Sequence, residues 1–223
     1  MRYNELTFQG RNAVLEAFRS GKTIDKLFIL DGCQDGPIKS IVREAKKTDA
    51  IINYVDKERL DRLAGTGHHQ GVVAIGAAYE YAEVEDILAA AKEKGEDPFI
   101  FILDEIEDPH NLGAIIRTAN LAGAHGVIIP KRRAVGLTAT VAKTSAGAIN
   151  YTPVAKVTNI SQTIEELKKQ GLWFVCADMG GETMYNLNLK GPIGLVIGNE
   201  GNGVSRLVKD KCCLLYTSPS PRD

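Results

Sequence analysis

The chain has 223 residues, of which 44% are hydrophobic and 25% charged, and its formal net charge is −1. This composition is typical of a globular protein of one or two domains. The near-neutral charge excludes a general polyanion binder, so any nucleic-acid contact must come from local patches. No apolar run reaches membrane-spanning length, residues 1–10 lack the apolar core of a secretory signal, and we expect a cytoplasmic protein. The 4 cysteines show no metal-ligand spacing, which predicts neither a disulfide nor a metal site.

The first part of the chain, residues 1–78, is predicted to alternate short helices and strands. Its hydrophobic pattern indicates helices over 10–20, 38–47 and 57–63 and strands over 24–30, 51–55 and 71–77. Such alternation is typical of a compact α/β domain. The polar stretch 79–83 predicts a linker.

The second part is predicted to form a parallel sheet. The pattern indicates helices over 84–94, 111–121, 139–148, 202–209 and one that starts at the cap residue Asn159, and strands over 99–103, 126–129, 152–155, 172–177 and 193–197. Repeated strand–helix–strand units favour parallel pairing. Strands 99–103 and 193–197 are almost wholly apolar, as expected of strands buried on both faces.

A glycine-rich loop follows the strand at 193–197. Residues 192–205 read PIGLVIGNEGNGVS, with Gly198, Gly201 and Gly203 around the single carboxylate Glu200. Glycine permits positive φ and a close approach of the backbone to a ligand, and a strand that ends in such a loop opens a crevice at its carboxyl end. The order G-x-x-G-x-G is not the dinucleotide-binding order, and no Walker lysine follows. The loop therefore predicts a ligand site and disfavours a nucleotide-dependent oxidoreductase.

A second polar loop follows the strand at 99–103. Asp108-Pro109 predicts a turn, and Asn111 is predicted to cap a helix that runs to about Leu121. Arg117 lies near the middle of this helix. We expect this loop and the glycine-rich loop to serve the same crevice.

Together the two loops resemble motifs 1 and 2 of the SpoU-type RNA 2′-O-methyltransferases, the trefoil-knot class that uses S-adenosylmethionine. The matching residues are Asn111, Gly113 and Arg117 in motif 1 and Gly198, Glu200, Gly201 and Gly203 in motif 2. The resemblance implies a knot-type parallel-sheet α/β methyltransferase domain over 84–212. It also implies that residues 1–78 form a small α/β RNA-binding domain, similar to kink-turn-binding ribosomal proteins. The knot is implied by the resemblance alone, because knotted chains are almost absent from proteins and general rules of chain topology would not predict one.

The resemblance implies S-adenosylmethionine as cofactor, RNA as substrate and a homodimer. A guanosine of 23S rRNA, as in the RlmB-like branch, is favoured over tRNA. The catalytic residues implied are Arg117, Asn111 and Glu200. A guanidinium is a poor proton acceptor, so Arg117 is favoured as a group that orients the ribose and stabilises the developing alkoxide rather than as a base. A surface salt bridge is the alternative.

Glu200 and Asn111 each have a structural alternative as well. Glu200 either pairs with Arg117, steers the ribose hydroxyl, or only stabilises the start of the following helix. Asn111 is a cap in its own right. Cofactor binding is expected of Ile197, Gly198 and Gly201, with Ala177 and Gly180 at the end of the preceding strand as neighbours in the crevice.

Three basic segments are candidates for RNA contact. Lys131, Arg132 and Arg133 follow the strand at 126–129 on the crevice side, where they either bind phosphate or remain solvated. Lys143 and Ser145 resemble a family segment near the substrate ribose, although a small-residue helix that packs on a neighbour explains them equally. Arg11 and residues 68–71 resemble segments of the family's N-terminal domain, with turn and capping roles as the alternative.

The end of the chain departs from the family pattern. The third family motif, a Ser-Leu-Asn turn, is absent, and residues 213–223 look like the translation of a sequencing-library adaptor, with a natural disordered tail as the alternative. We expect the genuine sequence to end near Cys212. The 223-residue chain is then expected to bind cofactor poorly and to lack activity, either as a truncated enzyme or as a non-catalytic RNA-binding module. A version in which a family-like segment with Ser-Leu-Asn follows Cys212, called the extended version below, is expected to be active.

Overall fold

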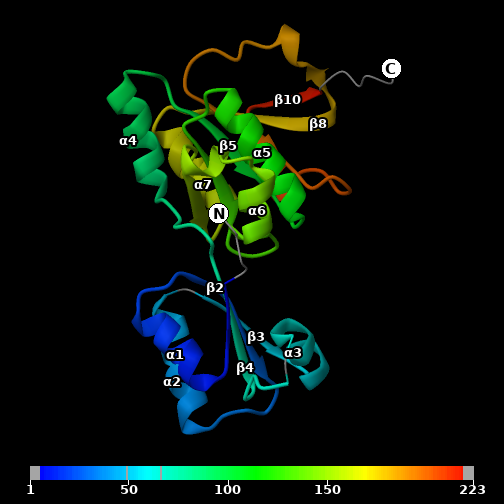
Figure 1. The fold of residues 1–223 in the computed structure, drawn as a ribbon. Helices are drawn as coiled ribbons and strands as arrows, with labels where there is room; N and C mark the ends of the chain where they lie inside the picture. The colour runs from blue at the N-terminus through cyan, green and yellow to red at the C-terminus, as the bar shows by residue number, and fades with distance from the viewer. Residues whose placement is uncertain (1–5, 49, 66, 218–223) are drawn as a thin grey trace. The chain divides into compact units, whose positions relative to one another are not determined.

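The structure is a computed structural model that describes residues 6–217 except 49 and 66. The chain divides into two compact units (Figure 1). The first unit comprises residues 1–80 with 136–140, and the second comprises 81–135 with 141–223. Within the described residues, no helix has both the length and the apolar character needed to cross a membrane.

The first unit is a mixed four-stranded sheet with helices on both faces. The strands β1 (Leu6–Gln9), β4 (Val72–Gly76), β2 (Ile24–Leu30) and β3 (Ile51–Val55) lie in that order. Only β2 and β3 are parallel. Side chains of β2 alternate between the faces: Leu27 and Ile29 pack with α1 (Arg11–Arg19) and α2 (Gly36–Lys47), and Phe28 packs with Leu60 of α3 (Lys57–Ala64).

The second unit is built on a six-stranded sheet in which every pairing is parallel, as the apolar strands predicted. The order is β10 (Leu214–Thr217), β8 (Trp173–Thr183), β9 (Ile193–Ile197), β5 (Phe99–Leu103), β6 (Gly126–Pro130) and β7 (Val154–Val157). From β5 the chain moves outward to β6 and β7, then crosses to β8 and β9 on the other side. The direction of winding thus reverses between β9 and β5.

Helices cover this sheet. One cluster joins Ile100, Ile102 and Ile128 of the sheet to α4 (Val84–Lys94), α7 (Ile160–Lys169) and α8 (Arg206–Lys209). Each such aliphatic side chain contributes about 1.5–3 kcal/mol when it is fully buried. The crossover helix α5 (Pro109–Leu121) connects β5 to β6, opposite in direction to the crossover through α7, so right-handed connections place the two on opposite faces.

Helix α5 starts two residues earlier than predicted. Pro109 occupies the first turn, where its missing N–H costs nothing, and the side chain of Asp108 accepts a hydrogen bond from the N–H of His110 at 2.6 Å. The predicted cap was therefore wrong: Asp108 caps the helix, and Asn111 lies inside its first turn. The side chain of Asn111 is thereby released for another partner.

Two further helices are shorter than predicted. Helix α6 (Ala139–Thr144) ends four residues before the predicted boundary, because Ala146 and Gly147 take left-handed φ values of +49° and +88°. Helix α8 begins at Arg206, not at residue 202, since the glycine-rich loop continues to Ser205. The glycine-rich loop is therefore longer than the sequence suggested.

The carboxyl end of the chain contributes a strand. Residues 214–217 form β10, which pairs in parallel with β8 through Leu214 and Val175 and through Leu215 and Cys176. Its exclusion from the fold as part of a tail was wrong, and the remaining tail residues, 218–223, lie outside the described residues. The strand β8 also reaches Thr183, well past the predicted end at residue 177.

The predicted linker 79–83 is partly built into the second unit. The N–H of Ala82 donates to the carbonyl of Val154 at 2.9 Å, and Ala82 forms a bridge with Ala155. The ammonium of Lys156 lies 4.7 Å from the ring centroid of Tyr81. In the first unit, the N–H of Ala78 donates to the carbonyl of Leu137, so the segment 136–140 belongs with that unit.

Candidate functional site

The carboxyl end of the second-unit sheet gathers three loops. They follow β5, β6 and β9, and β5 lies between the other two strands. Because the winding reverses between β9 and β5, the connections after these strands lead to opposite faces, and this is the place where an open α/β sheet is expected to carry a ligand crevice. Both sequence motifs border this crevice.

Two of the three predicted catalytic residues meet there. The Nδ2 of Asn111, in the first turn of α5, donates a hydrogen bond of 3.3 Å to Oε2 of Glu200 in the loop after β9. The two residues are 89 positions apart in sequence. This bond orients an exposed carboxylate at the mouth of the crevice.

Arg117 does not join this pair. It lies six residues beyond Asn111 on α5, which places it about 120° further around the helix. Its side chain is exposed, and its guanidinium has no hydrogen bond or ion pair with any residue in the described part of the chain. Of the alternatives given for Glu200, the pairing with Arg117 is not made in this structure, and the Arg117 guanidinium has no partner among the described residues.

Two glycines of the loop after β9, Gly198 and Gly203, are needed for the conformation of the loop itself. A Cβ on Gly198 would lie 2.1 Å from the carbonyl carbon of Gly203 and 2.2 Å from the nitrogen of Val204. The backbone crosses Gly198 there because Asn199 and Gly203 exchange two backbone hydrogen bonds of 3.0 and 2.8 Å. Of the three glycines only Gly203 has positive φ, at +68°. The prediction of positive φ thus holds at Gly203 alone, and Gly198 is required for a close backbone contact.

Two residues that the sequence reasoning missed fix this loop. Asn199 Oδ1 accepts from the N–H groups of Gly201 and Asn202 at 2.8 and 3.4 Å. The buried Asp104, directly after β5, accepts from the N–H of Ser205 through Oδ2 at 2.8 Å. Short polar residues that follow strands and can accept from backbone N–H groups were the available signal.

The motif 1 glycine allows α5 to pack against the end of α6. A Cβ on Gly113 would lie 1.9 Å from Oγ1 of Thr144 and 2.9 Å from the nitrogen of Ser145. Ser145 is fully buried, and its hydroxyl donates to the carbonyl of Ala142 at 3.0 Å. Its placement therefore agrees with the packing alternative and leaves its hydroxyl out of reach of RNA, whereas Lys143 is exposed.

The three basic residues of the loop after β6 differ in their exposure and in their contacts. Lys131 is half-buried, and its N–H donates to the carbonyl of Val157 at 2.8 Å. Arg132 is exposed, with no side-chain partner among the described residues. The guanidinium of Arg133 donates to Oε1 of Glu105 at 2.8 Å, and this carboxylate raises the pKa of Arg133 above its usual value.

The remaining cofactor candidates lie on β8 and β9. Ile197 ends β9, is half-buried, and its carbonyl accepts from the N–H of Asp104 at 2.8 Å. Ala177 follows Cys176, which pairs with Val196 of β9, and is also half-buried. Gly180 lies within β8, because that strand is longer than predicted. Among these candidates, Ala177 and Ile197 therefore present half-buried apolar side chains next to the glycine-rich loop.

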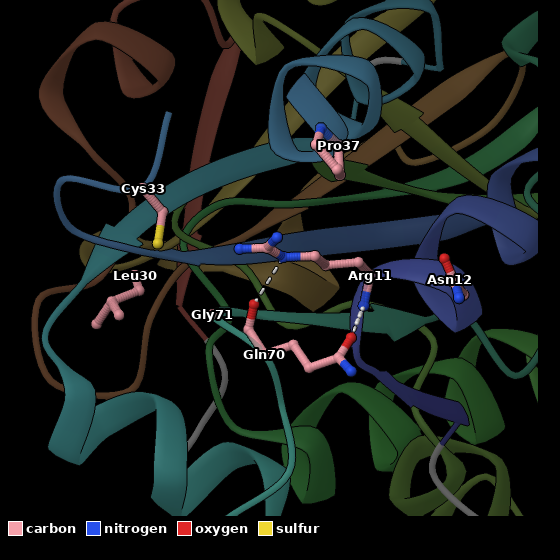
Figure 2. Close-up of a pocket in the computed structure, with 7 residues that line it drawn as sticks. All are labelled: Arg11, Asn12, Leu30, Cys33, Pro37, Gln70 and Gly71. Carbon is pink, nitrogen blue, oxygen red and sulfur yellow. Dashed lines mark hydrogen bonds between the residues drawn. The ribbon is translucent and has the colours of Figure 1, made fainter. Parts of the chain in front are cut away.

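The first unit has its own depression, a cavity of about 640 Å³ (Figure 2). Figure 2 shows Arg11 fixed against Gln70: the N–H of Arg11 donates to Oε1 of Gln70 at 3.1 Å and Nε donates to its carbonyl at 3.2 Å. The guanidinium also pairs with Asp35 at 2.5 Å. The cavity is lined by Arg11, Asn12, Leu30, Cys33, Pro37, Gln70 and Gly71.

His69, next to this depression, has a structural role. It is buried, Nδ1 accepts from the N–H of Gly71 at 2.9 Å, and Nε2 lies 2.9 Å from Asp61. A ring nitrogen that accepts from a backbone N–H must be unprotonated, so Nε2 carries the proton toward Asp61. No group of three or more His, Cys, Asp or Glu side chains suited to a metal ion occurs in the described part of the chain.

The fold and the crevice define a class: an α/β protein with a parallel sheet and a ligand site at its carboxyl end. The profile of the SpoU rRNA methylase family matches residues 98–221, and that of the RNA 2′-O ribose methyltransferase substrate-binding domain matches 9–82. The chain belongs to the SpoU rRNA methylase family. The family resemblance drawn from the two motifs is thereby confirmed.

Relatives agree with this assignment. YacO of Bacillus subtilis, whose name places it in the TrmH family of tRNA/rRNA methyltransferases, is 52% identical over 94% of this chain and 84% of its own length. A protein of Staphylococcus haemolyticus with a similar name is 48% identical over 93% and 84%, respectively.

Solved structures share the fold. The SpoU methyltransferase AviRb from Streptomyces viridochromogenes, in complex with AdoMet, aligns with a TM-score of 0.57 at 21% identity, over 97% of this chain and 81% of that one. The AdoMet-bound rRNA methyltransferase from Sinorhizobium meliloti aligns at 0.54 and 22%, over 96% and 78%. The predicted α/β fold class, with an N-terminal substrate-binding domain and a parallel-sheet methyltransferase domain, is confirmed.

Proposed function

We propose that the protein transfers a methyl group from S-adenosylmethionine to a ribose 2′-hydroxyl of structured RNA. The observation that carries the proposal is the bond between Asn111 and Glu200, which brings residues of both motifs together at the crevice. A guanosine of 23S rRNA is favoured over a tRNA nucleotide because of the substrate-binding domain at residues 9–82. A cytoplasmic homodimer is part of the same proposal.

The residues around the loop after β9 suit the adenosine part of this cofactor. Ala177 and Ile197 offer half-buried apolar surface on neighbouring strands. Gly198 lets the loop close on itself, and Gly201, where a Cβ would meet only Oδ1 of Asn199 at 3.4 Å, leaves the backbone open to close approach. When bound, S-adenosylmethionine would supply an activated methyl group. The backbone geometry that Asn199 fixes in this loop is the protein's contribution to holding it.

Side chains of the protein are assigned to the ribose hydroxyl and to the phosphates of the RNA. Glu200, oriented by Asn111, can accept a hydrogen bond from the ribose hydroxyl and so direct its oxygen. Arg117 has free donors, which suit a substrate phosphate and the charge that develops on the ribose oxygen. We do not assign Arg117 the role of the base. Arg132 and Lys143, both exposed, add phosphate contacts.

Calorimetry with S-adenosylmethionine tests the cofactor part. The 223-residue chain and the extended version are titrated side by side. We expect saturable binding by at least one of the two proteins. Binding by neither protein would contradict the proposal.

A variant tests the role of Glu200 in methyl transfer. Glu200→Gln keeps the shape of the side chain and removes its charge, so cofactor affinity should change by less than about threefold while methyl transfer falls by at least about tenfold. Equal transfer by the variant and its parent would remove Glu200 from the mechanism.

A further inference from the structure

Glu105 is the point at which the three loops of the crevice meet. It follows Asp104 in the loop after β5 and adopts φ of +58°, a left-handed value that disfavours any residue with a side chain. Such a conformation persists only when surrounding contacts hold it. Those contacts come from both neighbouring loops.

The first contact fixes the loop after β9. The Nδ2 of Asn199 donates to the main-chain carbonyl of Glu105 at 3.1 Å. The same amide accepts from the N–H of Gly201 through Oδ1 at 2.8 Å. Glu200 lies between Asn199 and Gly201 in sequence. The bond from Asn199 to the carbonyl of Glu105 therefore fixes the backbone that carries the Glu200 carboxylate.

The second contact fixes the loop after β6. The carboxylate of Glu105 accepts from Nη1 of Arg133 at 2.8 Å, and Arg133 also has a left-handed φ, +55°. Next to them, the N–H of Val135 donates to the carbonyl of Ile106 at 2.9 Å. The Arg133 side chain is 76% exposed and that of Glu105 32%. Because a guanidinium has five N–H donors, the remaining donors of Arg133 are available toward solvent.

We propose that Glu105 is a positioning residue that aims the guanidinium of Arg133 at a phosphate of the RNA substrate while its carbonyl holds the Glu200 loop. The phosphate contact and the ribose contact are thereby kept at a fixed spacing. This inference rests on the proposed function, because it assigns Arg133 to the RNA and Glu200 to the ribose.

Removal of the carboxylate should separate affinity from turnover. Without Glu105, no carboxylate offsets the charge of Arg133, so the loop presents one more net positive charge to the RNA while the guanidinium loses its fixed orientation. Binding then becomes tighter at low salt and more dependent on salt. Turnover falls, because a misplacement of about 1 Å at a reacting group costs up to about a hundredfold.

The experiment uses Glu105→Gly, since glycine accepts positive φ and retains the carbonyl. Binding of an rRNA fragment to the 223-residue chain is measured against salt concentration. We expect the slope of log K against log salt to steepen by about 0.7–0.9 and Tm to stay equal or rise. In whichever version methylates RNA, Glu105→Gly should lower kcat about tenfold or more. A purely structural role predicts the reverse: a lower Tm and an unchanged slope.

Three further variants complete the design. Glu105→Gln keeps the side-chain length and should lie between wild type and Glu105→Gly. Glu107→Gln removes an exposed carboxylate of the same loop that has no hydrogen bond to Arg133, and it should leave kcat unchanged. Glu105→Gly combined with Arg133→Gln should lose no more turnover than the worse single variant, because the two residues act as one pair.

An unchanged slope together with kcat within twofold of wild type in Glu105→Gly would overturn the inference. Additive losses in the double variant would also overturn it. Absence of methyl transfer by every wild-type version would overturn the proposed function alone, since the salt slope tests the Glu105–Arg133 pair without any reaction.

Discussion

Arg11 of the first unit and Arg117 of the second differ in how far other side chains hold them. Arg11, in the depression of the first unit, is fixed by Gln70 and Asp35, which accept hydrogen bonds from its backbone N–H, its Nε and its Nη2. Arg117, on α5 of the second unit, has no side-chain partner among the residues that the structure describes. A fixed arginine shapes a surface in advance, whereas one with free donors can respond to charge that develops during a reaction. We therefore expect chemistry to depend on Arg117 and RNA affinity to depend on Arg11.

The largest effect is expected for Arg117→Ala in the extended version. Loss of a group that stabilises developing charge lowers kcat by about 10²–10³-fold. Because the side chain has no partner, Tm should stay within about 1 °C of the parent. Cofactor affinity should stay near normal. Tritium transfer from labelled S-adenosylmethionine to RNA gives the rate.

Arg117→Lys is the matched control for this prediction. It keeps the charge and loses the planar fork of donors, so it should not restore turnover. Turnover of the alanine variant within a few-fold of its parent would show that Arg117 is an ordinary surface arginine.

The next effect concerns the loop after β9. A valine side chain at Gly198 meets the backbone of Gly203 and Val204 at 2.1–2.2 Å, and backbone cannot move aside cheaply. Gly198→Val should cost about 1–3 kcal/mol of stability and weaken S-adenosylmethionine binding more than RNA binding. Denaturant unfolding and calorimetry measure the two quantities.

Gly201→Ala is the control for stability within the same loop. Its Cβ would meet only Oδ1 of Asn199, at 3.4 Å, so the free energy of unfolding should change little. Equal cofactor affinity in Gly198→Val and wild type would remove this loop from the cofactor site.

A smaller effect is expected in the first unit. Arg11→Ala loses the partly exposed pair with Asp35, which contributes about 1 kcal/mol or less, and should weaken RNA binding a few-fold. Asp35→Asn keeps an oxygen for the N–H of Ile38 at the start of α2 and frees Arg11, so RNA binding should tighten. Fluorescence anisotropy with a labelled rRNA fragment follows both variants. A change in the same direction for both would contradict the role given to Arg11.

The smallest effect on stability is expected for the ion pair between Glu44 and Lys47 in α2, which is assigned no role in either site. The ammonium of Lys47 lowers the pKa of Glu44 below its ordinary 4.5. A lowered pKa in the folded state adds stability above that ordinary value, and the gain is lost as pH falls through the lowered pKa. Lys47→Gln should therefore reduce Tm slightly at pH 7 and not at all near pH 3. A larger difference at pH 3 than at pH 7 would contradict this sign.

Much of the fold followed from hydrophobic pattern. The strands 24–30, 51–55 and 99–103 have the predicted bounds, because continuous apolar runs between polar turns leave few alternatives. The strand β1 was missed, since four residues that pair antiparallel with β4 carry too short a pattern. Its existence depends on a partner about 70 residues away, which local sequence cannot reveal.

The site was predictable only in part. Motif spacing identified Asn111 and Glu200, and the fold brings them together. Asp104, Glu105 and Asn199 were missed, because each acts through hydrogen bonds to a loop distant in sequence. The left-handed φ of Glu105 carries no sequence signal, since glutamate is an uncommon choice there.

The central claim is that the crevice between the loops after β5 and β9 methylates a ribose oxygen. The most direct measurement is mass spectrometry of nucleosides from rRNA and tRNA that were incubated with S-adenosylmethionine and the protein, in both the 223-residue and the extended version. We expect 2′-O-methylguanosine from 23S rRNA with at least one version and none with the Arg117→Ala variant of that version. Methyl groups on a base, or no methylated nucleoside with either version, would contradict it.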